Sequence, residues 1–347
     1  MKKLVSKLRL RKKTPPTSRI TSDTIDQHRE HVLAGGRRFK YPIQYARHKL
    51  VFNAIIISFL AVIIAVAVGW WQLYPQQNTS DFMYHVTKVI PIPVATVDGQ
   101  PVLYSDYLMK YISSIRYLER KEQLNTKTDD GKRQVEYIKQ KSMQYVIANA
   151  YAVKMAKQLG LSVSNSELET YLKDLRQTSA GEISEQTNNA VILDYYGWSP
   201  AEYHYIIKNE LLRQKVSYAM DKPALGAVTS IKDAIKADPN VDYKTLASTI
   251  STKTGIKVEY GTSGWVPKTN QDGGLAVQVS KLKKLESSSD IKSTSGKGYY
   301  FVRLLDINDD QVSYDYINVP LTAFDKSLEK VQADGKVSEY ISIPKTD

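Results

Sequence analysis

The sequence predicts an α+β protein with a single transmembrane helix, followed by a mainly helical module and a small α+β domain. Three observations support this prediction: one long apolar run near the N-terminus, capped helical periodicity up to about residue 221, and mixed helix and strand signals beyond it. The 347 residues include no cysteine. Disulfides, thiolate catalysis and cysteine metal sites are therefore excluded, and the folded part depends on its hydrophobic cores.

The apolar run extends from Leu50 to Trp71, and Asn53 and Ser58 are its only clearly polar side chains. A helix of this length spans about 33 Å, enough to cross a hydrocarbon core of about 30 Å. A cleaved signal peptide is the alternative, but its apolar region is typically about 7–15 residues long and ends in small residues. This run is longer and ends in bulky residues. We therefore predict an uncleaved transmembrane helix, a signal anchor, at residues 50–73.

Basic residues are distributed very unevenly about that helix. Residues 1–49 contain 14 Lys and Arg against 3 Asp and Glu, whereas the rest of the chain is nearly neutral at +1. The positive-inside tendency places the basic end in the cytoplasm and the remainder outside it. The proline, serine and charge content of this end predicts a disordered tail that contacts anionic lipid. It lacks the apolar face and interleaved aromatics of a nucleic-acid module, so no nucleic acid is expected as a partner.

The first segments beyond the membrane are predicted from turn and cap signals. Residues 74–89 are polar and predict a stalk. A short strand near Val94–Thr96 is followed by Asp98-Gly99, a dipeptide typical of a tight turn. Ser105 is placed to cap a helix whose apolar residues recur at helical spacing. These signals predict a small strand element at the start of a helical module.

Stronger helix boundaries follow along the chain. A helix over residues 132–159 ends at Gly160, where glycine commonly takes the left-handed conformation. The segment Ser164–Glu167 fits a capping box in front of the next apolar repeat. A further helix starts at Ser199-Pro200, with serine as the cap and proline at the first position, where its missing N–H is harmless. We therefore predict one helical module over residues 90–221.

Three stretches of this module resemble one known family. They are the strand and turn VATVDGQPV, the joint LGLSVSNSELETYL and the segment YYGWSPAEYHYIIKNELLRQKV, in that order over roughly 130 residues. Together they resemble the SurA/PrsA-type N-terminal chaperone domain. The resemblance implies an extracytoplasmic folding helper that holds unfolded exported polypeptides. The usual second part of such proteins is a parvulin-type peptidyl-prolyl isomerase domain.

Residues 222–347 resemble that second part in outline. Two helical patterns precede Gly264-Trp265, which is similar to the parvulin LGW strand, and a short helix follows near residues 275–285. The segment GYYFVRLLD, residues 298–306, is similar to the parvulin GYHIIKL strand. The resemblance therefore implies a small parvulin-like α+β domain.

The C-terminal end of the chain also resembles the beginning of such a domain. The segment Val312–Leu321 is similar to the first parvulin strand, and a helix is predicted after it at Ala323–Ala333. We expect this strand to complete the sheet that contains Tyr299–Leu305 from the opposite chain end, as in a permuted arrangement.

The isomerase site of that family does not carry over intact. The resemblance places its two histidines at Tyr300 and Tyr316 and its usual Cys or Asp at Lys253, and the usual pocket phenylalanine is absent between Trp265 and Leu285. It also implies a peptide-binding surface at Trp265, Leu275 and Tyr300. These residues indicate a degenerate catalytic site, and aromatic packing across strands is the alternative role of the two tyrosines. We expect no metal site and no cofactor.

These observations predict a membrane-anchored extracytoplasmic chaperone that binds unfolded or newly exported polypeptides. We expect it to cross the cell membrane once, with its N-terminus in the cytoplasm. Its 24 tyrosines against 6 phenylalanines offer amphipathic contact area. Two alternatives stay open: an active parvulin-type isomerase, and a non-catalytic envelope adaptor or scaffold. An apolar groove in the helical module would favour the chaperone, and a uniformly polar surface would favour the adaptor.

Overall fold

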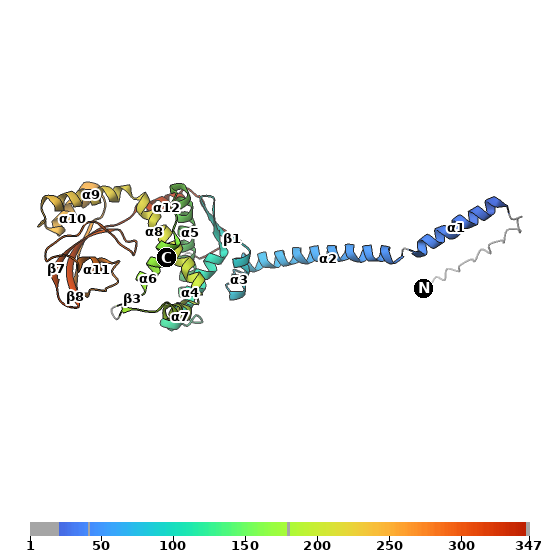
Figure 1. The fold of residues 1–347 in the computed structure, drawn as a ribbon, viewed down its shortest axis with the longest axis horizontal. Helices are drawn as coiled ribbons and strands as arrows, with labels where there is room; N and C mark the ends of the chain where they lie inside the picture. Colours follow the sequence, from blue (N-terminus) through green and yellow to red (C-terminus); the bar gives the residue numbers. More distant parts are fainter. Residues whose placement is uncertain (1–20, 41, 179–180, 345–347) are drawn as a thin grey trace. The chain divides into compact units, whose positions relative to one another are not determined.

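The computed structural model describes residues 21–40, 42–178 and 181–344 (Figure 1). It contains two compact units, Met1–Gln72 and Leu73–Asp347. In the first unit, helix α1 (Ser22–Lys40) precedes α2 (Pro42–Leu73), whose last residue already belongs to the second unit. The stretch His48–Leu73 of α2 is long and apolar enough to cross a membrane, as judged from length and composition. This agrees with the spanning segment predicted at residues 50–73.

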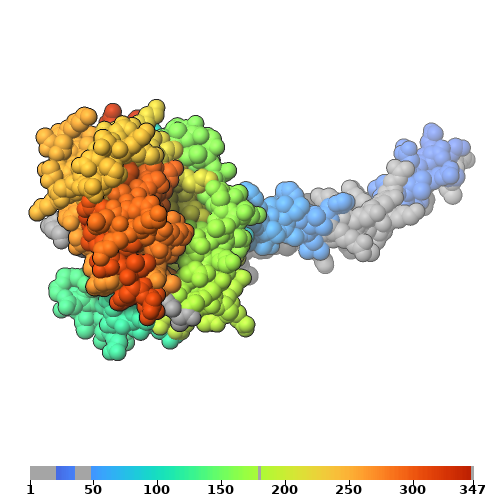
Figure 2. Space-filling view, turned by 60° about the vertical axis from the view of Figure 1, so that its left-hand side comes forward, coloured from blue at the N-terminus to red at the C-terminus, as the bar shows by residue number. Residues whose placement is uncertain are grey.

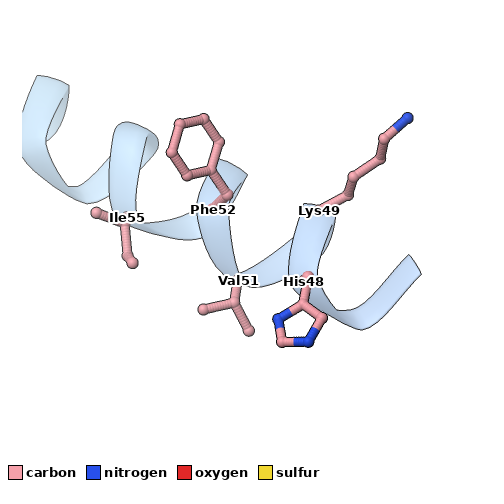
Figure 3. Close-up of a pocket in the computed structure, with 5 residues that line it drawn as sticks. All are labelled: His48, Lys49, Val51, Phe52 and Ile55. Atoms are coloured by element: carbon pink, nitrogen blue, oxygen red, sulfur yellow. The ribbon is translucent and has the colours of Figure 1, made fainter. Parts of the chain in front are cut away.

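The start of this stretch is visible in Figure 3, where all labelled side chains come from one helix. The polar residues His48 and Lys49 come first, and the apolar residues Val51, Phe52 and Ile55 follow within two turns. The hollow between these side chains lies on the outside of a single helix. It therefore marks the edge of the apolar stretch and is no binding site.

The prediction of a disordered tail over residues 1–49 is wrong for the part that forms α1. Two hydrogen bonds between Thr21 and Thr24 stabilise the start of this helix. The Thr21 N–H donates to Thr24 Oγ1 at 3.0 Å, and the Thr24 hydroxyl donates to the Thr21 carbonyl at 2.7 Å. The chain from Ser22 to Lys40 contains no proline: Pro15 and Pro16 of the tail lie before it, and Pro42 begins α2. Residues 1–20, which contain Pro15 and Pro16, are outside the described residues.

Most of the second unit's helices lie before residue 221 (Figure 1). Long helices α5 and α8 pack together with α4 around one core, and α6 and α7 pack on α8 and α4. The predicted caps at Gly160, Ser164 and Ser199 are all present, and the last two are full capping boxes. The helices are α3 (Asp81–Val89), α4 (Tyr104–Lys121), α5 (Asp129–Leu159), α6 (Asn165–Leu175), α7 (Glu185–Tyr196) and α8 (Pro200–Met220). A hairpin of β3 (Gln177–Thr178) and β4 (Gly181–Glu182) joins α6 to α7.

The segment predicted as a polar stalk is instead part of this folded unit. Helix α3 occupies most of residues 74–89 and is capped by Ser80, whose hydroxyl accepts from the Met83 N–H at 3.4 Å. Met83 and Thr87 are buried, and Met83 joins a core cluster that also contains Leu73. The stalk prediction is therefore wrong. Only two positions of α3 face inward, so its buried stripe is too short to stand out from a polar sequence.

A small sheet connects the two ends of the second unit. Strands β1 (Pro93–Val97) and β2 (Gln100–Leu103) form a hairpin at the predicted turn, whose residues Asp98 and Gly99 both have positive φ. Strand β9 (Val337–Glu339) pairs antiparallel with β1, giving the order β2-β1-β9. The last part of the region predicted as one domain, residues 222–347, therefore pairs instead with the hairpin at the start of the second unit.

The C-terminal helix α12 (Ala323–Ala333) also packs on the helical part. Phe324 lies 5.5 Å from Tyr151 of α5, measured between ring centroids, and both residues belong to the core cluster that contains Leu73. The assignment of this helix to the parvulin-like domain is therefore wrong. Its apolar face completes the helical core, and β9 follows it into the small sheet.

The remaining residues form an antiparallel sheet covered on both faces, which we call the sheet domain. Its helices are α9 (Lys222–Ala237), α10 (Tyr243–Thr254) and α11 (Leu275–Val279), and its strands are β5 (Glu259–Pro267), β6 (Ile291–Lys292), β7 (Tyr299–Ile307) and β8 (Gln311–Val319). The strand order is β5-β8-β7-β6. Because β8 pairs with both β5 and β7, the expectation that the C-terminal strand completes this sheet is confirmed.

Side chains alternate between the two faces of that sheet. Tyr299 and Phe301 of β7 pack with α9 and α10, whereas Val302 and Leu304 pack with α11. On the α9 and α10 side, Asp315 receives two hydrogen bonds from Arg303, at 2.6 and 3.2 Å. The sheet therefore has two cores of different composition.

The sheet domain is held against the helical part by two sets of contacts. Asp221, at the end of α8, accepts hydrogen bonds from the first turn of α9 and from the start of α12. The backbone carbonyl of Thr294 accepts from Tyr171 and Gln214, both at 3.1 Å, and Tyr218 donates to the Gly298 carbonyl at 2.8 Å. In the space-filling view, the orange sheet domain lies directly against the green and yellow helices (Figure 2).

Candidate functional site

An apolar cleft of about 250 Å³ lies between helices α3, α4 and α8. Its exposed lining is mainly carbon, with a few polar groups converging on it. We call it the α3–α4–α8 cleft, and it is lined by Tyr84, Lys88, Leu103, Ser105, Asp106, Met109, Ala201, Glu202 and Tyr205. Concave apolar surfaces with a few placed polar groups are typical of binding sites.

One wall of the cleft is built by the capping box of α8. Glu202 Oε2 accepts from the Ser199 N–H at 2.8 Å, which leaves Oε1 free to accept from Tyr84 and from Lys88, the latter at 2.8 Å. Burial raises the pKa of Glu202, but the hydrogen bonds from Lys88, Tyr84 and Ser199 outweigh it and lower the pKa to about 2. The ionised carboxylate thus connects α3 to the start of α8.

The opposite wall carries a carboxyl group in apolar surroundings. Asp106 of α4 accepts from the Tyr205 hydroxyl at both oxygens, at 3.0 and 3.2 Å. Burial raises the pKa of Asp106 to about 6, although the hydrogen bond from Tyr205 acts in the opposite direction. Near neutral pH this carboxylate is ionised at an energetic cost, and mild acid neutralises it.

The structure brings the two predicted catalytic-position tyrosines together on the α11 face of the sheet. The rings of Tyr300 and Tyr316 lie 5.7 Å apart. The Tyr316 ring lies over Gly261, and a Cβ atom on that glycine would lie 2.5 Å from the ring. Leu275 is buried in the same cluster, and Tyr314 beside it donates to Asp272 Oδ2 at 2.5 Å. These contacts fit the alternative role of aromatic packing across strands.

Lys253, the third predicted catalytic position, lies apart from the two tyrosines. It is exposed in the last turn of α10. The buried residues of α10 pack against Tyr299 and Phe301, on the face of the sheet opposite to Tyr300. The three predicted positions therefore do not converge on one reacting bond.

A β-bulge in β5 places Trp265 on the opposite face of the sheet from Leu275 and Tyr300. The register of β5 and β8 shifts between Thr262 and Trp265, where Gly264 has a φ of 63°. One extra residue in β5 turns the Trp265 side chain to the face opposite to Leu275. Trp265 is half exposed there, so the predicted three-residue peptide surface is not assembled.

No group of three or more His, Cys, Asp or Glu side chains that could hold a metal ion occurs in the part of the chain that the structure describes.

Sequence reasoning missed the α3–α4–α8 cleft. The Ser199 cap is a local signal, but it does not reveal that the free oxygen of Glu202 binds Tyr84 and Lys88, more than 110 residues earlier. Only the docking of α3 creates the cleft, and the sequence predicts a stalk over residues 74–89. The signal that could have found α3 is the N-cap residue Ser80 in front of Met83 and Thr87, which lie four residues apart on one side of a helix.

The fold defines a class of protein. A helical domain is completed by segments from both ends of the second unit, and a helix long and apolar enough to cross a membrane precedes it. The family described as the SurA-like N-terminal domain matches residues 43–217, about half of the chain. The chain belongs to this family, as the sequence resemblance implied. Its fold class, α+β with a helical SurA-type module, is likewise confirmed.

A comparison with solved structures matched a protein from work on PEB4 and Cj1289, described as two structurally related SurA-like chaperones in Campylobacter jejuni. The match has 12% sequence identity and a TM-score of 0.24, and it covers 70% of this chain and 90% of the other. No curated protein matches the chain.

Proposed function

We propose that this protein is a membrane-anchored extracytoplasmic chaperone that holds unfolded, newly exported polypeptides. Membership of the SurA-like family supports a chaperone role in general. The observation on which the specific proposal rests is the apolar α3–α4–α8 cleft within the family-matching region. Its lining favours the chaperone over the adaptor, because a spacer has no need of an open apolar hollow.

The cleft is suited to weak, reversible binding. Fully burying one Leu, Phe or Met side chain contributes about 1.5–3 kcal/mol, so a single client side chain gives only millimolar-range affinity. Tyr84 and Tyr205 line the cleft while their hydroxyls stay hydrogen-bonded to Glu202 and Asp106, so they offer amphipathic contact area to such a side chain. A client is therefore held by several such contacts along its length and released when it folds.

The proposed orientation rests on the charge asymmetry about the candidate span. Residues 1–49 carry 14 of the 48 basic side chains but only 3 of the 36 acidic ones, which favours a cytoplasmic N-terminus. Because the chain contains no cysteine, Tyr137→Cys is a clean reporter of the second unit. A membrane-impermeant maleimide added to intact cells is expected to label it. Labelling only after lysis would place this unit in the cytoplasm and refute the proposal.

Aggregation of an unfolded client tests the proposed activity. The full chain in nanodiscs is expected to suppress it, and Ala201→Glu is expected to abolish most of the suppression by placing a carboxylate in the cleft. A glutamate in the first turn of α8 is favourable for the helix, so the variant should fold. Ala190→Glu, at an exposed position of α7, is the matched control. Equal suppression by all three proteins would contradict the role of the cleft.

An active prolyl isomerase is the second candidate, favoured by the proximity of Tyr300 and Tyr316. Rotation about the X–Pro bond has a barrier of about 20 kcal/mol, and lowering it requires groups preorganised around that bond. Since Lys253 lies on the other side of the sheet, we expect no acceleration in a prolyl-peptide isomerisation assay. Acceleration that Tyr300→Phe removes would establish the enzyme instead.

A further inference from the structure

Helix α3 leaves an apolar face uncovered. Phe82 is 68% exposed and Val89 is 83% exposed, and Ile90 at the end of the helix is also exposed. Phe82, Val86 and Val89 follow the i, i+4, i+7 spacing that places them on one side of a helix. We call Phe82, Val86, Val89 and Ile90 the outer face of α3.

This face is distinct from the two sides of α3 that are already occupied. Met83 and Thr87 face the core, and Tyr84 and Lys88 line the cleft. Lys88 is directed toward Glu202 by its ion pair at 2.8 Å. The outer face is mainly apolar, with the exposed ring of His85 at its edge, and the helix is amphipathic in a second direction that the fold does not use.

The position of α3 along the chain identifies what covers this face. Leu73, the last residue of the candidate span, belongs to the same core cluster as Met83. Its carbonyl accepts a hydrogen bond from Tyr104 at 2.7 Å, so the folded unit begins at the residue where the span ends. Seven residues separate Leu73 from the start of α3.

Tyr104, the first residue of α4, donates the hydrogen bond to Leu73, and α3 packs against α4, so α3 lies close to the end of the span. The polar interfacial regions of a bilayer add about 5–8 Å on each side of the hydrocarbon core. If the span crosses a membrane, α3 therefore lies near the depth of the lipid headgroups. An apolar helix face at that depth is stabilised by insertion at the boundary between headgroups and acyl chains.

We propose that the outer face of α3 inserts into the outer surface of the membrane that α2 spans. This inference rests on the proposed membrane anchoring. Insertion fixes one side of α3 in lipid and leaves Tyr84 and Lys88, on another side, free to line the α3–α4–α8 cleft. The cleft then opens close to the bilayer surface, where a polypeptide leaving the membrane first becomes accessible.

Single cysteines with an environment-sensitive nitrobenzoxadiazole label test this proposal in the full chain, which has no cysteine of its own. Val89→Cys reports on the outer face, Val62→Cys on the span and Val191→Cys on an exposed position of α7. Each variant is placed in nanodiscs of phosphatidylcholine and phosphatidylglycerol, with and without lipid that carries a doxyl quencher near the headgroup. Val89 is mostly exposed, so its replacement leaves the fold intact, and Phe82→Cys provides an independent second position.

The labels at Val89 and Phe82 are expected to emit at shorter wavelength in nanodiscs and to lose about half of their fluorescence to the quencher, as interfacial burial of about 5–10 Å implies. The label at Val191 should show neither change. If the Val62 label is quenched and those at Val89 and Phe82 are not, the inference fails while the anchoring stands. If Val62 is also unquenched, the anchoring itself fails. If the Val89 label shifts to shorter wavelength only after addition of unfolded client, the face binds clients. If it shifts only at high protein concentration in detergent, the face binds a second copy. Either result would overturn the proposal.

Discussion

Asp221 is expected to be one of the most sensitive polar side chains in this fold. It is 1% exposed and stands where the chain leaves α8 and enters α9. Oδ1 accepts from the Ala224 N–H at 3.0 Å and thereby caps α9. Oδ2 accepts from the N–H groups of Thr322 and Ala323, at 2.6 and 2.9 Å. Because Thr322 makes no cap bond with its own side chain, Asp221 also caps α12 from a distance.

The Asp221→Ala variant leaves three N–H groups without their acceptor, one buried at Ala224 and two partly buried at Thr322 and Ala323. Loss of one helix cap costs about 0.5–2 kcal/mol, and a buried hydrogen bond to a charged group is worth about 1.5–3 kcal/mol. Two caps lost together, one of them joining segments a hundred residues apart, give an expected destabilisation of about 3–4 kcal/mol. Asp221→Asn keeps one carbonyl acceptor and should lose about half as much.

Urea unfolding of the full chain in mild detergent, followed by circular dichroism, measures this loss. The matched control is Asp242→Ala, because Asp242 caps only α10, at an exposed position, by accepting from the Thr245 N–H at 2.8 Å. We expect the control to lose about 1 kcal/mol. Hydrogen exchange at Thr322 and Ala323 should accelerate in Asp221→Ala and stay unchanged in the control. Equal losses in the two variants would refute the double-cap reasoning.

Two further predictions concern buried charges. In the cleft, the folded-state pKa of Asp106 is raised above its usual 3.8 to about 6, so its ionisation opposes folding as pH rises from about 4 to 6. Asp106→Asn should therefore be more stable than the parent by about 1–3 kcal/mol at pH 7.5 and equally stable at pH 4, as thermal unfolding at the two pH values would show. In the sheet domain, Arg303→Met leaves the buried carboxylate of Asp315 unpaired and should cost about 3–5 kcal/mol in urea unfolding, whereas the double variant Arg303→Met with Asp315→Leu should recover most of that loss.

Local signals in the sequence predicted local structure well. The glycine at 160 and the capping boxes at Ser164 and Ser199 fix helix ends through hydrogen bonds within four residues, so a short window contains all the information. The cap expected at Ser105 is wrong, because packing and not a local signal decides that boundary. The N-cap position is Leu103, two residues earlier, and α4 begins at the fully buried Tyr104 without a side-chain cap.

Features that depend on distant contacts could not be predicted. The pairing of β1 with β9 joins Ala95 to Glu339, and a three-residue strand shows no readable alternation. The docking of α3 depends on Glu202, whose second role is invisible in the capping-box motif. At the candidate peptide surface, the bulge at Gly264 reverses the face of Trp265, and no residue pattern marked that extra position.

The C-terminal strand shows that resemblance can supply a distant contact when a pattern cannot. Residues 312–321 were expected to complete the sheet because they resemble the first strand of a parvulin domain, and β8 does pair with β7 and β5. The same resemblance gave no warning that α12 packs in the other core. A parvulin-like identity for the sheet domain stays a prediction.

The central claim is that unfolded polypeptide binds in the α3–α4–α8 cleft. A photoreactive benzoylphenylalanine in place of Tyr205, which lines the cleft and is 42% exposed, measures this directly in the full chain. The control position is Tyr137 of α5, which is outside the cleft and 44% exposed. We predict that irradiation crosslinks a chemically unfolded client at position 205 far more than at position 137, and that the native client crosslinks at neither. Equal crosslinking at the two positions, or none at 205, would contradict the claim.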